Sequence, residues 1–149
     1  MHITSNHLLE ALRSQGLRIT AARRAVCAVV AERQGQHLTA AGILEDIRSD
    51  QGSKVDQSTV YRTLDALETS GLLVHSHLGH GPAVYHLEAE AAHQHVVCRA
   101  CGAAVSIPAE SLDGWIIILR ETTGFEVDPT HFAITGLCAE CAARRVPAE

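Results

Sequence analysis

The stretch that decides the fold is 93-HQHVVCRACG-102, in which two histidines one residue apart run directly into a Cys-x-x-Cys pair. A second pair, Cys138 and Cys141, stands near the C-terminus. Two such pairs suit a closed tetrahedral zinc site, because each pair aims two sulfurs at one point and the intervening chain folds back. We therefore predict that Cys98, Cys101, Cys138 and Cys141 bind a structural zinc ion.

Disulfides and a redox Cys-x-x-Cys motif are the alternatives to zinc. The N-terminal segment has no apolar signal sequence, so the chain is expected to be cytoplasmic, where stable disulfides are rare. A thioredoxin-like motif needs a βαβ setting that the flanking sequence does not supply. No apolar run approaches the roughly 18 residues that span a bilayer, so no membrane partner is expected.

Histidines point to a second kind of metal site. His93 and His95 alternate on an extended segment, so both rings project from one face of the predicted strand. The chain has ten histidines, and several lie between residues 75 and 95. Neutral imidazole binds nickel, zinc, copper and iron, which predicts an exchangeable metal site.

The net charge of −5 is unevenly distributed along the chain. Residues 1–87 have eight Lys/Arg and eight Asp/Glu, whereas residues 88–149 have four against nine. In the first part, four arginines follow one another with no acidic residue between them: Arg13, Arg18, Arg23 and Arg24. A basic cluster of this kind is compatible with a phosphate-facing surface, although a charge run is more often a solvated face.

The sequence of residues 1–87 predicts four helices and two strands. Helices are expected over residues 6–15 with Asn6 as N-cap, after Thr20, and from Thr39 to about residue 49. A fourth helix is expected over residues 57–68, followed by strands over 72–77 and 83–87 around a Gly-rich turn. This order of elements is typical of a winged helix-turn-helix.

The fourth helix has two distinct faces. Val60, Leu64 and Leu67 recur at i, i+4 and i+7 and predict a buried face. The opposite face presents hydrogen-bonding groups and one charge near the N-terminal end: Gln57, Ser58, Thr59, Tyr61 and Arg62. These groups suit a DNA groove, and an ordinary amphipathic packing helix is the alternative.

The sequence predicts two domains. The first covers residues 1–87 and the second covers residues 93–149, with an acidic linker over residues 88–92 between them. The second domain reads as two strands, 94–98 and 103–107, a helix over about 110–122 with Trp115, Ile116 and Leu119 inward, and a strand over 132–137. That helix is apolar nearly all round, which favours a homodimer that covers it. The fold class is therefore α+β, with a winged helix-turn-helix followed by a small α/β dimerisation domain that contains the four-cysteine zinc site.

Three motifs together, 58-STVYRTL-64, 93-HQHVVCRACG-102 and 136-GLCAEC-141, resemble the ferric uptake regulator (Fur) family of bacterial metalloregulators. The resemblance implies a metal-dependent repressor that binds a double-stranded DNA operator as a homodimer. It implies a hinge metal site that draws on His37, His93 and His95. For a DNA-binding helix of this kind we expect Tyr61 and Arg62 at bases or backbone, and Arg18, Ser58 and Thr59 at phosphates.

Within the family, the segments 74-VHSHLGHG-81, 85-YHL-87 and 130-THFAI-134 resemble the nickel-responsive Nur branch. This implies a second, nickel-type site at His75, His77 and His131, with Ni²⁺ or another divalent transition metal as the regulatory ion. His86 stands where iron and peroxide sensors have a carboxylate, and Ala91 and Ala92 interrupt the histidine run of nickel regulators, so His86 is expected to fill the missing hinge position.

Several other functions are alternatives to a nickel-responsive regulator. Iron-, zinc- and peroxide-responsive regulation are alternatives within the family. A metal-storage protein would leave the helix over residues 57–68 without a purpose. A zinc enzyme would need an open coordination position and a general base in a pocket, and nothing in the sequence places one, so the chain is not expected to be an enzyme.

Overall fold

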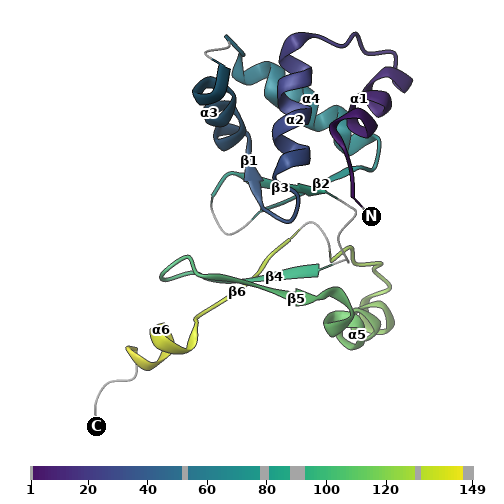
Figure 1. Ribbon diagram of the computed structural model, residues 1–149. Coiled ribbons are helices and arrows are strands. Elements are labelled where there is room, and N and C mark those ends of the chain that lie inside the picture. The colour runs from purple at the N-terminus through teal and green to yellow at the C-terminus, as the bar shows by residue number, and fades with distance from the viewer. Residues whose placement is uncertain (1, 52–53, 78–80, 88–92, 130–131, 146–149) are drawn as a thin grey trace. The chain divides into compact units, whose positions relative to one another are not determined.

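The structure is a computed structural model that describes residues 2–51, 54–77, 81–87, 93–129 and 132–145. The chain divides into two compact units, one formed by Met1–His75 with Ala83–Glu90 and the other by Ser76–Pro82 with Ala91–Glu149. Helices and strands occur in both units (Figure 1), so the predicted α+β class is confirmed. The predicted linker, residues 88–92, lies outside the described residues, and the predicted domain boundaries stay a prediction.

The first unit contains four helices: α1 (Ser5–Ser14), α2 (Ala21–Glu32), α3 (Ala40–Gln51) and α4 (Gln57–Thr69). The predicted caps at Thr20 and Thr39 are correct: the Thr20 hydroxyl accepts from Arg23 N at 3.2 Å, and the Thr39 hydroxyl accepts from Gly42 N at 3.0 Å. The predicted cap at Asn6 is wrong. Thr4 caps α1 instead, because its hydroxyl accepts from His7 N while the His7 ring accepts from Thr4 N.

The core of the first unit is built from the apolar faces of these helices. The predicted buried face of α4 is confirmed, since Val60, Leu64 and Leu67 are fully buried. Leu8 and Leu12 of α1 are equally inaccessible and belong to the same cluster. Truncation of one such leucine to alanine typically costs about 2–5 kcal/mol, so this core fixes the orientation of α4.

A small sheet follows the helices, with β1 (Leu38–Thr39), β3 (Ala83–Leu87) and β2 (Leu73–His77) in the order β1-β3-β2; most of it belongs to the first unit, and the last two residues of β2 are counted with the second. Strands β2 and β3 form the predicted wing. Figure 1 shows the four helices gathered on one side of this sheet. Strand β1 was not predicted, because two residues are too short for a recognisable alternation; it pairs antiparallel with β3, with Leu38 opposite Tyr85.

The second unit is organised around a sheet in the order β5-β4-β6. The central strand β4 (His93–Cys98) pairs antiparallel with β5 (Ala104–Pro108) and parallel with β6 (Ile134–Gly136). Between β5 and β6 lie the 3₁₀ helix η1 (Ala109–Leu112) and α5 (Asp113–Thr123), and α6 (Ala139–Ala143) follows β6. The predicted helix over residues 110–122 is therefore two elements, and α6 was not predicted.

Helix α5 is largely exposed. Ile117 and Ile118 are 52% and 58% accessible, and Ile116 and Leu119 are half-buried. The predicted inward position of Trp115 is wrong within one chain: its side chain is 46% exposed and contacts only Phe132 among described aromatic rings, at a centroid distance of 6.2 Å. The sequence pattern marks these positions as apolar but does not distinguish a domain core from a surface that a partner covers.

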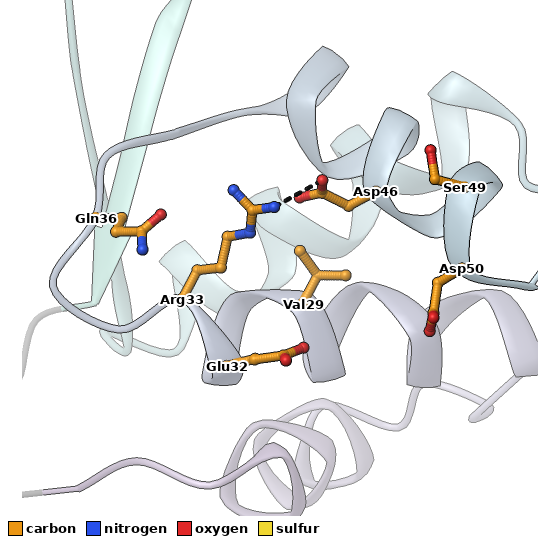
Figure 2. Close-up of a pocket in the computed structure, with 7 residues that line it drawn as sticks. All are labelled: Val29, Glu32, Arg33, Gln36, Asp46, Ser49 and Asp50. Atoms are coloured by element: carbon orange, nitrogen blue, oxygen red, sulfur yellow. Dashed lines mark hydrogen bonds and ion pairs between the residues drawn. The ribbon is translucent and has the colours of Figure 1, made fainter.

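A surface groove of about 550 Å³ lies between α2 and α3 (Figure 2). It is lined by Val29, Glu32, Arg33, Gln36, Asp46, Ser49 and Asp50. Arg33 and Asp46 form an ion pair at 2.8 Å that links the two helices, as the dashed line in Figure 2 shows. None of the residues that line this groove is a predicted metal ligand or DNA contact, so the groove shares no residue with the candidate sites.

Candidate metal centres and nucleic-acid interface

The two Cys-x-x-Cys pairs come together at one end of the second sheet. Parallel pairing of β4 with β6 sets Cys98 opposite Gly136, which carries the second pair to the end of β4. In the first pair, Gly102 N donates to Cys98 O at 2.9 Å, and Gly102 adopts a φ of 77° that favours glycine. In the second pair, Ala142 N donates to Cys138 O at 2.9 Å. Local turns therefore aim each pair of sulfurs at one point.

The four sulfur atoms of this cluster all lie within 4.8 Å of one another. The Sγ atoms of Cys101 and Cys138 are 3.8 Å apart. A tetrahedral zinc with Zn–S bonds of about 2.3 Å sets its sulfurs about 3.8 Å apart, so the donor set and spacing fit zinc. All five cysteines are free thiols, which argues against the disulfide alternative. The predicted four-cysteine cluster is thus confirmed.

The thiols of this cluster are already inequivalent without an ion. Backbone N–H groups of Cys138, Cys101 and Ala100 lower the pKa of Cys98 to about 6. Hydrogen bonds with the Cys138 and Cys101 side chains raise the pKa of Cys141 to about 12. One thiolate is therefore stabilised near neutral pH, which is the form that binds a metal. Cys27, buried in α2, has its pKa raised to about 11 by desolvation and is an inert core residue.

A histidine pair lies on β4 in the second unit. His93 and His95 project from one face of the strand, with ring centroids 4.9 Å apart. His95 is buried, and β5 sets Ser106 opposite it, with the Ser106 hydroxyl 3.4 Å from His95 Nδ1. Gln94, on the other face, accepts a hydrogen bond from His95 N and donates one to Pro129 O. The segment that carries the two rings is thereby fixed from both faces.

A second histidine pair lies in the first unit. His37 immediately precedes β1 and His86 lies in β3, and the antiparallel register that sets Leu38 opposite Tyr85 brings them together. Their ring centroids are 5.4 Å apart in an edge-to-face arrangement. The sequence prediction that His86 belongs with His37 thus has a geometric basis within this unit.

The histidines predicted for a further site lie mainly on the wing. His75 and His77 are on β2, and His131 lies outside the described residues. His75 Nδ1 is 2.5 Å from a carboxylate oxygen of Glu68 on α4. The contacts of Glu68 with His75, of Ser106 with His95 and of Gln94 with Pro129 were not predicted, because contacts between elements depend on a register that no local motif encodes.

The predicted DNA-contacting residues lie mostly at the surface of the first unit. Ser58, Tyr61 and Arg62 are exposed near the N-terminal end of α4. Thr59 is half-buried, and its carbonyl accepts a hydrogen bond from the Thr63 hydroxyl at 2.7 Å. Arg18 is exposed, and its carbonyl accepts from the Arg23 guanidinium at 2.5 Å. The polar end of α4 is therefore available to a groove while its apolar face anchors the helix.

A winged helix-turn-helix joined to a small sheet domain with a four-cysteine cluster defines a class of two-domain metalloproteins. The sequence pattern of the ferric uptake regulator family matches residues 14–135, and the chain belongs to that family. It is 26% identical over 133 residues to the ferric uptake regulation protein of Neisseria gonorrhoeae, covering 89% of this chain and 92% of that one. It is 32% identical over 108 residues to the zinc uptake regulation protein of Mycobacterium tuberculosis, covering 66% and 82%.

Solved structures agree with this assignment at the level of fold. The ferric uptake regulator of Helicobacter pylori, whose structure reveals three functional metal binding sites, aligns with a TM-score of 0.72 over 99% of this chain and 98% of that chain, at 21% identity. These relatives are regulators of metal uptake, and none of them is named as an enzyme. Among the described helices, none has the length and apolar character needed to cross a membrane.

Proposed function

We propose that this protein is a cytoplasmic, metal-dependent transcriptional repressor that binds double-stranded operator DNA as a homodimer. The observation that carries the proposal is that each compact unit has its own pair of adjacent histidines. The rings of His37 and His86 are 5.4 Å apart in the first unit, and those of His93 and His95 are 4.9 Å apart in the second. Two pairs of imidazoles supply the four nitrogen donors of one transition-metal site.

When bound, a divalent ion supplies a fixed link between the two histidine pairs. His37 and His86 then tie the winged domain to His93 and His95 in β4. In a dimer this link favours one separation of the two α4 helices, which suits operator half-sites roughly 34 Å or a multiple apart. Without the link, DNA binding must also order the two domains, so affinity falls. The four-cysteine cluster retains its zinc in both states and serves stability.

Dimer formation is supported by the exposed apolar surface of the second unit. Val105 on β5 and Ile117 and Ile118 on α5 are all more than half accessible. Several large apolar side chains exposed in one small domain are typical of a protein interface rather than of a solvated face. A second copy of the chain would cover it and set two winged domains at a defined spacing.

For the regulatory ion we propose nickel. His86 and the three other hinge histidines offer only imidazole nitrogen, and replacing a carboxylate by imidazole favours the later first-row metals over Mn²⁺ and Fe²⁺. A second nickel-type site is proposed at His75, His77 and His131. Iron, zinc or peroxide response is the alternative within the family, and the curated relatives include both ferric and zinc uptake regulators.

The hinge proposal is tested by replacing His93 and His95 with alanine in zinc-loaded protein. DNA affinity is measured by fluorescence anisotropy at one fixed salt concentration, because phosphate contacts make affinity salt-dependent. The double variant should keep its zinc and lose the metal-dependent increase in affinity. Metal-dependent binding equal to that of the wild type would refute the hinge assignment. His2→Ala/His7→Ala is the matched control, since these exposed histidines lie outside both proposed sites.

A further inference from the structure

A hydrogen bond to a carboxylate joins α4 to the wing strand β2. His75 Nδ1 on β2 lies 2.5 Å from Glu68 Oε1 in the last turn of α4, and each side chain is about 30% exposed, at 31% and 29%. Both residues belong to the first unit. The contact is therefore a feature of one compact body.

The turn between α4 and β2 explains why residues seven apart meet. Gly71 N donates to Glu68 O at 2.8 Å and Leu72 N donates to Leu67 O at 3.2 Å, which is the hydrogen-bond pattern of a Schellman motif. Gly71 has a φ of 72°, a conformation that favours glycine. The chain reverses at this turn, and β2 carries His75 back beside Glu68.

Glu68 occupies a position that helix electrostatics disfavour. A carboxylate in the last turn meets the negative end of the helix dipole, and α4 has no basic residue in that turn. A cationic or hydrogen-bond-donating partner from outside the helix offsets this effect. The His75 ring provides it, and the Tyr85 ring, with its centroid 6.1 Å away, further restricts the imidazole.

Engagement of Nδ1 decides which nitrogen can bind a metal. When one ring N–H of a histidine donates to a carboxylate, the tautomer is fixed and the other nitrogen carries the lone pair. The same carboxylate makes the imidazole a stronger ligand. A metal taken by His75 therefore binds through Nε2, with the ring orientation set by α4.

We propose that Glu68 is the positioning residue of the second metal site, fixing His75 so that Nε2 receives a divalent transition metal. The inference rests on the proposed function, because it takes His75 as a ligand. Because Glu68 is part of α4, it would connect that metal site directly to the helix that carries Tyr61 and Arg62. A positive ion near the C-terminal end of α4 is also favourable to the helix dipole.

The experiment uses the zinc-loaded chain with His93 and His95 replaced by alanine, so that the second site alone reports. Ni²⁺ affinity is measured by equilibrium dialysis, and the ligand field by Co²⁺ visible absorption. Glu68→Gln should weaken Ni²⁺ binding about ten- to hundredfold and shift the Co²⁺ bands, because loss of an outer-shell partner has this effect. His75→Ala should abolish binding at this site. Glu45→Gln, which removes an exposed carboxylate from α3, is the matched control and should change neither readout.

The outcomes separate the two proposals. If His75→Ala loses Ni²⁺ while Glu68→Gln binds it like the background protein with unchanged Co²⁺ bands, the role of Glu68 is overturned and the second site stands. If His75→Ala binds Ni²⁺ as tightly as the background protein, the second site fails and the role of Glu68 with it. Should Glu68→Gln lose its folded circular dichroism spectrum, Glu68→Asp replaces it. That variant should also bind Ni²⁺ more weakly, and unchanged affinity would overturn the inference.

Discussion

The Sγ atoms of Cys101 and Cys138 lie 3.8 Å apart, although the two residues are 37 positions apart in the sequence. That spacing matches two vertices of a tetrahedral zinc–sulfur site, and it depends on the parallel pairing of β4 with β6. The zinc site and the sheet therefore support each other: the sheet brings the cysteine pairs together, and a bound zinc would hold the ends of the sheet.

Replacing Cys101 with serine should remove the structural zinc and unfold much of the second unit. That unit has few buried apolar side chains of its own: of the apolar residues in its described part, only Val97 and Cys98 are buried. Zinc content by mass spectrometry and thermal unfolding by circular dichroism measure the effect. Cys27→Ala is the control: it should destabilise the first core yet retain one zinc per chain. Full zinc retention by the Cys101 variant would refute the site.

Acid should release the zinc in a defined pH range. The pKa of Cys98 is lowered to about 6 from the ordinary value of 9, so its thiolate persists as pH falls from neutrality to about 6 and is protonated below it. We expect zinc to stay bound between pH 8 and about 6 and to be released progressively at lower pH. A chelator-dye assay across this range measures it. Full retention of zinc well below pH 6 would contradict coordination by these thiolates.

Arg62→Ala should weaken DNA binding at low salt and reduce the slope of log affinity against log salt by about one unit, if Arg62 neutralises one phosphate. Anisotropy titrations at several KCl concentrations give the slope. Arg33→Ala is the matched control, because Arg33 is exposed but paired with Asp46 on α3 (Figure 2). Equal slopes for the Arg62 variant and the wild type would remove Arg62 from the interface.

Ile118→Asp should weaken self-association by more than tenfold, because it buries a charge in the proposed dimer interface. Analytical ultracentrifugation of zinc-loaded protein measures the dissociation constant. Ala28→Asp introduces the same charge at an exposed position of α2 and should leave the dimer intact. If Ile118→Asp sediments like the wild type, α5 is not at the interface.

Local sequence patterns predicted much of this fold. The 3.6-residue period of Val60, Leu64 and Leu67 predicted the buried face of α4, and the caps at Thr20 and Thr39 follow from side-chain chemistry within four residues. The four-cysteine cluster was predictable because each pair carries its own turn geometry.

Features that depend on tertiary register were not predictable. The two-residue strand β1, the Glu68–His75 contact and the Ser106–His95 contact arise only once strands and helices are aligned. The orientation of Trp115 was predicted wrongly, because an apolar helix face reads the same whether its own chain or a partner covers it.

The most direct test of the account measures how a second metal changes DNA affinity. Zinc-loaded protein, stripped of all other metal, is titrated against DNA from upstream of its own gene, with Ni²⁺, Zn²⁺, Fe²⁺ or Mn²⁺ added separately at one salt concentration. We expect weak binding without added metal and tight binding restored by Ni²⁺ at low free concentration. If Fe²⁺, Mn²⁺ or additional Zn²⁺ restores tight DNA binding equally well, the proposed nickel selectivity is contradicted, but metal-dependent repression is not. Tight, specific binding with no second metal at all would contradict metal-dependent repression.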